Sequence, residues 1–89
     1  SANIEFISEI LKETIQDTET KKKKIISDVL KRVAEKLHNT ASVCKSNYID
    51  PYLIDTYMKD SKRFMATFRG SSSKEDITDG YLELLKNKI

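Results

Sequence analysis

The stretch KLHNTASVCKSNYIDPYL, residues 36–53, decides how this chain divides into helices. It holds the only histidine, the only cysteine and the only proline of the chain, together with its first tyrosine. Pro51 disfavours a helical backbone at Asp50 and suits the first turn of a new helix, for which Asp50 is a good N-cap. This pair therefore predicts a break in the chain followed by a helix over residues 51–59.

Residues upstream of this break predict two further helices. The first, over residues 20–38, carries an apolar stripe at helical spacing that consists of Ile26, Val29, Leu30, Val33 and Leu37. Asn39 and Thr40 can end that helix and cap a short one over residues 41–47. The cysteine of the chain, Cys44, then falls on the inner face of the short helix, where it is expected to be a small core residue.

The N-terminal part has the pattern of one amphipathic helix over residues 3–16. Its apolar side chains recur at spacings that place them on one helix face, namely Ile4, Ile7, Ile10, Leu11 and Ile15. Asp17 and Thr18 are candidates to break this helix or to cap the next one. The N-terminal part therefore predicts a first helix and a short turn.

The C-terminal part predicts two more helices. Residues 61–69 can form a short helix, and Ser72 with Glu75 three residues later is a capping-box pattern in front of a last helix over residues 74–88. No segment shows the alternation of apolar and polar residues that is typical of a strand. We therefore expect residues 1–89 to form a single all-α domain of five to six short helices.

The composition limits the class of protein. The 89 residues fit one small domain, and a charged fraction of 34% with an apolar fraction of 38% indicates a soluble, folded chain. A net charge of +2 is too small to indicate nucleic-acid binding by itself. The single cysteine excludes an internal disulfide and fits an intracellular, reducing compartment. No apolar run is long enough to span a membrane and no signal-peptide pattern is present, but the chain lacks an initiator Met, so we expect it to be part of a longer protein.

The residues offer few candidates for chemistry. His38 has no partner at metal-ligand spacing, and the sequence has no Gly-rich phosphate loop, so neither a metal nor a cofactor is predicted. Tyr48 stands out because small, polar and basic residues surround it directly before the break. A tyrosine hydroxyl is a weak nucleophile unless its surroundings stabilise the phenolate or accept its proton. The residues alone leave both a packing role and a chemical role open for Tyr48.

One segment resembles a known family. VAEKLHNTASVCKSNYIDP, residues 33–51, is similar to the active-site tyrosine segment of the type IB DNA topoisomerases of bacteria and large viruses. In that branch a helix ends in Val-Ala-Glu-x-Leu-Gly-Asn-Thr, and the chain continues through Ala-Val-Cys-(Arg/Lys) to Tyr-(Ile/Val)-(His/Asp)-Pro. This sequence matches nearly every one of those positions in order and without a gap. Residues 2–59 fit the resemblance at some level, whereas the tail, residues 60–89, does not.

The resemblance implies roles for three residues. Tyr48 matches the nucleophile, which in the family attacks a DNA phosphodiester and leaves a 3′-phosphotyrosyl bond and a free 5′-hydroxyl. Asn39 falls where the family has a His or Asn that contacts a non-bridging phosphate oxygen, and an amide donor suits the charge that develops there. Lys45 falls at a basic position of the motif and is expected to contact DNA phosphate. The implied partner is double-stranded DNA, and the implied reaction relaxes supercoils without a metal or a cofactor.

Two departures from the family pattern change what is expected of this chain. His38 stands where the family has Gly, and it lies ten residues before Tyr48 rather than nine, so Asn39 is the expected phosphate contact. The two catalytic arginines and the lysine general acid of the family lie upstream of the tyrosine segment and have no match here. We expect an upstream part of the same polypeptide to supply them, and we expect this fragment alone neither to cleave nor to relax DNA.

Three other interpretations stay open. A tyrosine recombinase uses the same nucleophile, although recombinases typically have Leu-Gly-His where this chain has Leu-His-Asn. A non-catalytic helical module could use its lysines to bind nucleic acid or an acidic protein. In a purely structural interpretation, Tyr48 anchors the helix over residues 41–47 against the helix over residues 51–59.

Overall fold

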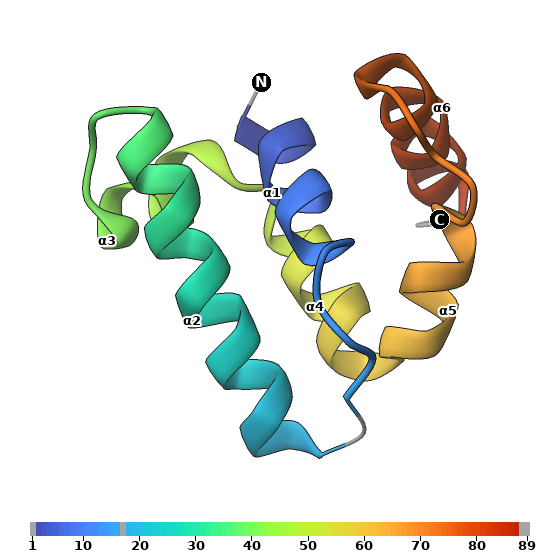
Figure 1. Cartoon of the computed structure of the whole chain (residues 1–89), viewed down its shortest axis with the longest axis horizontal. Helices are drawn as coiled ribbons and strands as arrows, with labels where there is room; N and C mark the ends of the chain where they lie inside the picture. The colour runs from blue at the N-terminus through green and yellow to red at the C-terminus, as the bar shows by residue number, and fades with distance from the viewer. Residues whose placement is uncertain (1, 17, 88–89) are drawn as a thin grey trace.

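The computed structural model describes residues 2–16 and 18–87, and every regular element within these ranges is helical. The elements are α1 (Ala2–Ile10), α2 (Glu19–Lys36), α3 (Ala41–Val43), the π-helical turn η1 (Cys44–Tyr48), α4 (Pro51–Lys59), α5 (Ser61–Thr67) and α6 (Lys74–Lys86). Figure 1 shows α1 between α2 and α6, with α4 and α5 completing the bundle. The predicted all-α fold is confirmed.

The hydrophobic core surrounds α1, the element with the highest share of buried apolar residues. Phe6, Ile7 and Ile10 have no exposed surface. They pack with apolar side chains of the other helices, of which the most deeply buried are Val29, Val33, Leu53, Tyr57, Phe64 and Phe68. Burial of these side chains is the main stabilising contribution to a domain of this size.

Side-chain caps begin most of the helices, as the polar residues in the sequence predict. The Thr40 hydroxyl accepts a hydrogen bond from the Val43 amide over 3.2 Å, and an Asp50 carboxylate oxygen accepts one from the Tyr52 amide over 2.9 Å. Thr18 caps α2 in the same way, whereas Asp17 lies outside the described residues. Each cap satisfies a backbone amide that has no partner within its helix.

The helices predicted over residues 3–16 and 20–38 end earlier than expected, and the one predicted over residues 61–69 ends at Thr67. The helix predicted over residues 3–16 ends at Ile10, because the amides of Lys12 and Glu13 form short-range bonds to the carbonyl three residues back. Ile15, which the pattern placed on the buried face, is therefore 46% exposed. Leu37 is likewise 38% exposed, because α2 ends at the residue before it.

The cap of the last helix is one residue later than predicted. Ser73, not Ser72, is the N-cap of α6, and its hydroxyl accepts a hydrogen bond from the Asp76 amide over 3.2 Å. The Asp76 carboxylate in turn accepts a bond from the Ser72 amide over 3.2 Å. The predicted pair of Ser72 and Glu75 is therefore wrong by one position, because consecutive serines offer the same capping chemistry.

The C-terminal tail packs onto the rest of the domain. The Phe64 ring lies edge-on to Tyr57 with ring centres 5.6 Å apart, and its centre is 5.1 Å from that of Phe68. Phe68 in turn faces Gly80 of α6, where an added Cβ would lie 2.7 Å from the ring. These contacts explain why a glycine stands inside a helix, a position that normally disfavours it.

A nearly buried carboxylate joins α1 to α2. Glu9 is 4% exposed, and its carboxylate lies 2.8 Å from the Lys12 ammonium and 2.9 Å from the Lys36 ammonium. Arg32 Nε is 2.9 Å from the same carboxylate, although its N–H forms no hydrogen bond within the described part of the chain. The hydrogen bond from Lys12, followed by that from Lys36, lowers the pKa of Glu9 to about 2 against the opposing effect of burial.

Candidate functional site

Tyr48 is presented to solvent at the end of the π-helical turn η1. Its side chain is 48% exposed and is not part of the hydrophobic core. Its hydroxyl has no hydrogen-bond partner among residues 2–16 and 18–87. The backbone on either side is held firmly, because Cys44 has no exposed surface and Ile49 is 3% exposed. The side chain at position 48 is therefore accessible while its backbone is anchored.

The turn that carries Tyr48 is wider than an α-helical turn. The Ile49 amide donates to the Cys44 carbonyl over 2.9 Å, five residues back. The sequence predicted an ordinary helix over residues 41–47, whereas the structure has only one α-helical turn, α3, followed by η1. Single π-helical turns are rare and occur often at functional sites. The geometry therefore singles out this segment independently of its sequence.

Asp50 fixes the end of the tyrosine segment to three helices. Its amide donates to the Asn3 side chain of α1 over 2.7 Å. One carboxylate oxygen caps α4 through the Tyr52 amide, and the other accepts a hydrogen bond from the Tyr81 hydroxyl of α6 over 2.7 Å. Burial, followed by this hydrogen bond, raises the pKa of Tyr81 to about 12, because both favour the protonated hydroxyl that donates to Asp50.

Asn39 lies in the turn between α2 and α3, nine residues before Tyr48. Its amide donates to the Ala34 carbonyl over 2.9 Å, and its side-chain oxygen accepts a bond from the Thr40 amide over 3.0 Å. The side chain is exposed, and its NH₂ group has no partner among the described residues. This group is therefore available to donate to an external acceptor, as the resemblance requires of it.

The helix end before Asn39 closes as a Schellman turn. His38 has a φ of 55°, in the left-handed region that favours glycine, and its amide bonds to the Glu35 carbonyl over 3.2 Å. The resemblance places a glycine at this position in the family. The turn therefore forms here with a strained histidine, and His38 is exposed with no role in the core.

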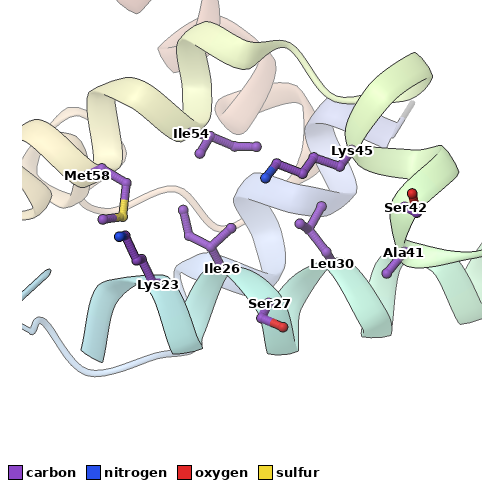
Figure 2. A pocket seen from close by; sticks show the side chains of 9 residues that line it. All are labelled: Lys23, Ile26, Ser27, Leu30, Ala41, Ser42, Lys45, Ile54 and Met58. Carbon is purple, nitrogen blue, oxygen red and sulfur yellow. The ribbon is translucent and has the colours of Figure 1, made fainter. Parts of the chain in front are cut away.

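Lys45, the third residue singled out by the resemblance, lines a surface groove. Figure 2 shows its side chain extending from η1 over a surface groove of about 550 Å³ between α2 and α4. Lys23, at the start of α2, reaches over the same groove from its other end. Asn39 thus lies just before α3 and Tyr48 ends η1, whereas Lys45 of η1 lies on the groove between α2 and α4.

Two features of this region could not be found from the sequence pattern. The bond between Tyr81 and Asp50 joins residues 31 positions apart, and nothing in the sequence around either residue indicates it. One of the four consecutive lysines, Lys22, donates from its ammonium to the Met58 carbonyl near the end of α4. A run of consecutive lysines at a helix start usually forms a solvated face, so nothing in the sequence around Lys22 indicates this contact.

No group of His, Cys, Asp and Glu side chains in residues 2–16 and 18–87 is arranged to hold a metal ion. Within the same ranges, no helix combines the length and the apolar character that crossing a bilayer requires. The chain matches no protein-family model, no curated protein and no solved structure. Inferences about its function therefore depend on the residues of the tyrosine segment and on their geometry.

Proposed function

We propose that this chain is the tyrosine-bearing part of a type IB DNA topoisomerase, which relaxes supercoiled DNA by breaking and resealing one strand. The observation that carries the proposal is Tyr48 on its anchored π-helical turn, 48% exposed and with no hydrogen-bond partner for its hydroxyl within the described ranges 2–16 and 18–87. The tyrosines that pack in this domain differ from Tyr48, because Tyr57 is 1% exposed and the Tyr81 hydroxyl is paired with Asp50. The similarity of residues 33–51 to the tyrosine segment of that family supports the same conclusion.

In the proposed reaction, the Tyr48 oxygen attacks the phosphorus of a DNA phosphodiester. A bond forms between the tyrosine oxygen and the 3′-phosphate, and the bond to the 5′-oxygen of the next nucleotide breaks. The tyrosine proton passes to solvent, and a lysine of the upstream polypeptide protonates the leaving oxygen. Because the phosphotyrosyl ester is similar in energy to the phosphodiester, the reverse step reseals the strand without ATP.

Asn39 is proposed to stabilise the charge that develops on a non-bridging phosphate oxygen. Its NH₂ group has no partner in the described part of the chain, and its side-chain oxygen is held by the Thr40 amide, which orients the donor group. A preorganised neutral donor of this kind stabilises a transition state more than a ground state. Arginines of the upstream polypeptide are expected to supply the remaining charge, so this fragment alone is expected to be inactive. Its free, buried Cys44 thiol suits an intracellular, reducing compartment.

The proposal is tested in the polypeptide that joins this chain to its upstream catalytic part. That protein is incubated with a nicked DNA duplex from which the short 5′-leaving strand diffuses away, and denaturant-resistant protein–DNA complexes are counted. Tyr48→Phe is expected to abolish these complexes while the melting temperature stays within about 3 °C of wild type, since an exposed hydroxyl adds little stability. Tyr52→Phe is the matched control, because its hydroxyl faces the Leu84 carbonyl rather than solvent.

Complexes that form equally well in Tyr48→Phe would rule out the proposed nucleophile. If Tyr48 is required, the substrate then separates the two enzyme classes. A topoisomerase relaxes any supercoiled plasmid, whereas a recombinase exchanges strands between defined sites. A folded parent protein that binds the duplex and forms no complex at all would favour the non-catalytic module.

A further inference from the structure

We propose that the groove between α2, the α3–η1 segment and α4 binds an acidic amphipathic helix of a partner protein. The groove has a volume of about 550 Å³ and is open to solvent along one side. Its use does not require Tyr48 or DNA, so this inference is independent of the proposed strand cleavage. Three properties of the groove support this partner: its apolar floor, its positively charged ends and its length.

The floor of the groove is apolar. Ile26 and Leu30 of α2 lie opposite Ile54 and Met58 of α4, and all four side chains face the opening in Figure 2. Ile26 and Leu30 are nearly buried, at 6% and 5% exposed, whereas Ile54 and Met58 are only partly buried. An occupant of the groove therefore gains mainly by removing the exposed aliphatic surface of Ile54 and Met58 from water.

The ends of the groove are positively charged. The Lys23 and Lys45 side chains extend over it from opposite ends, and none of the described residues that line it carries a carboxylate. Neither lysine forms an ion pair or hydrogen bond within residues 2–16 and 18–87, in contrast to Lys36 and Lys74, which pair with α1 carboxylates. The two unpaired ammonium groups indicate that the complementary surface carries a carboxylate at each end.

The length of the groove suits a helix. Its α2 wall runs from Lys23 to Leu30, two helical turns or about 10 Å. A partner helix spans that length with aliphatic side chains at positions i, i+4 and i+7, the usual pattern of a helix bound in a groove. A DNA backbone could pair with Lys23 and Lys45 but has no aliphatic stripe to cover the floor. The proposal therefore gives Lys45 a protein partner in place of the phosphate contact that the resemblance implies.

The test is a titration of the ¹⁵N-labelled 89-residue chain with a designed peptide, followed by NMR. The peptide is about 18 residues long, with leucines at i, i+4 and i+7 and a glutamate beyond each end of that stripe. In one control peptide lysines stand in place of the glutamates, and in a second control peptide serines stand in place of the leucines. The chain is also titrated with a short DNA duplex of random sequence.

Two double variants separate the groove from general charge effects. Lys23→Glu with Lys45→Glu reverses the charge at both ends of the groove. Lys31→Glu with Lys62→Glu changes the net charge equally at exposed positions outside the groove. We expect the first pair to weaken peptide binding about tenfold and the second to change it less than about threefold, as is usual for exposed ion pairs. Tyr48→Phe is expected to bind as wild type does.

The expected result is that the acidic amphipathic peptide shifts the amide signals of Ile26, Leu30, Lys45 and Ile54, and that both control peptides bind more weakly. Three results would overturn the proposal. They are the absence of binding up to about 1 mM peptide, equal binding by the lysine-substituted peptide, and signal changes confined to other surfaces. Stronger shifts of the same signals by the DNA duplex would identify the groove as a DNA-binding surface instead.

Discussion

Replacing Glu9 by glutamine removes the charge at the centre of the ion pairs that join α1 to α2. The carboxylate is nearly buried and lies within 2.9 Å of Lys12, Lys36 and Arg32. Glutamine keeps the size of the side chain, so the variant tests the charge rather than the packing. We expect Glu9→Gln to destabilise the domain at neutral pH.

The pKa of Glu9 sets the magnitude. Lowering it from 4.5 to about 2 corresponds to at most about 3 kcal/mol at 1.36 kcal/mol per pH unit. The partner side chains are 42–65% exposed, so solvent screens them, and we expect about 1.5 kcal/mol. Because the folded-state pKa is the lower one, this stability is fully present above pH 4.5 and is lost as the pH falls toward 2.

The assay is urea unfolding followed by circular dichroism at pH 7 and at several values between 4.5 and 2.5. The difference in the free energy of unfolding between wild type and Glu9→Gln is expected to shrink across that acid range. Glu83→Gln is the matched control, because its pair with Lys86 is 66% and 72% exposed, and it is expected to change stability by less than about 0.5 kcal/mol. A difference that is absent at pH 7, or that stays constant down to pH 2.5, would refute the reasoning.

Three further substitutions test the turns and contacts around the tyrosine segment, each measured by urea unfolding. His38→Gly relieves a left-handed φ of 55° and is expected to stabilise the domain by about 0.5–1 kcal/mol, and any loss of stability would contradict the strain. Tyr81→Phe removes the 2.7 Å hydrogen bond to Asp50 and is expected to cost about 1.5 kcal/mol, whereas an unchanged stability would show that the bond contributes nothing. Gly80→Ala gains about 1 kcal/mol in helix propensity but places a Cβ 2.7 Å from the buried Phe68 ring, so we expect a net loss of about 1 kcal/mol or more. A more stable Gly80→Ala variant would mean that the ring moves freely.

The starts of helices could be predicted from the sequence where a polar capping residue stands at a break in the helical pattern. Thr40 and the Asp50–Pro51 pair mark their helix starts correctly, because local hydrogen bonding and the proline ring act within a few residues. Ile15 was placed wrongly because its spacing continues a helical pattern beyond the point where the chain turns away. The chain after α1 instead makes tertiary contacts that the pattern does not indicate, such as the Ser61 hydroxyl that donates to the Gln16 carbonyl over 2.8 Å.

The candidate site could be predicted only in part. A resemblance singled out Tyr48, Asn39 and Lys45, but the degree of exposure of each depends on how distant helices pack. Burial of Cys44 was predicted from its helix face and is confirmed. The link from Asp50 to Tyr81 and the direction of Lys45 both require the three-dimensional arrangement, because each involves elements that are far apart in the sequence.

The anchoring of Asp50 connects the tail to the residue proposed as the nucleophile. Tyr81 of α6 holds the carboxylate two residues after Tyr48, and Asn3 of α1 holds the amide of the same residue. If Tyr48 is the nucleophile, loosening Asp50 is expected to alter how the tyrosine is presented. The tail would then contribute through this one contact, although the resemblance does not extend to it.

The most direct test of the central claim is to map the covalent adduct. The polypeptide that joins this chain to its upstream catalytic part is incubated with the nicked duplex and digested with protease and nuclease. Its peptides are then analysed by mass spectrometry. The account predicts a nucleotide attached to the peptide that contains Tyr48, through a 3′-phosphate ester on its oxygen. A folded, DNA-binding protein whose Tyr48 peptide is recovered only in its unmodified form would contradict the account.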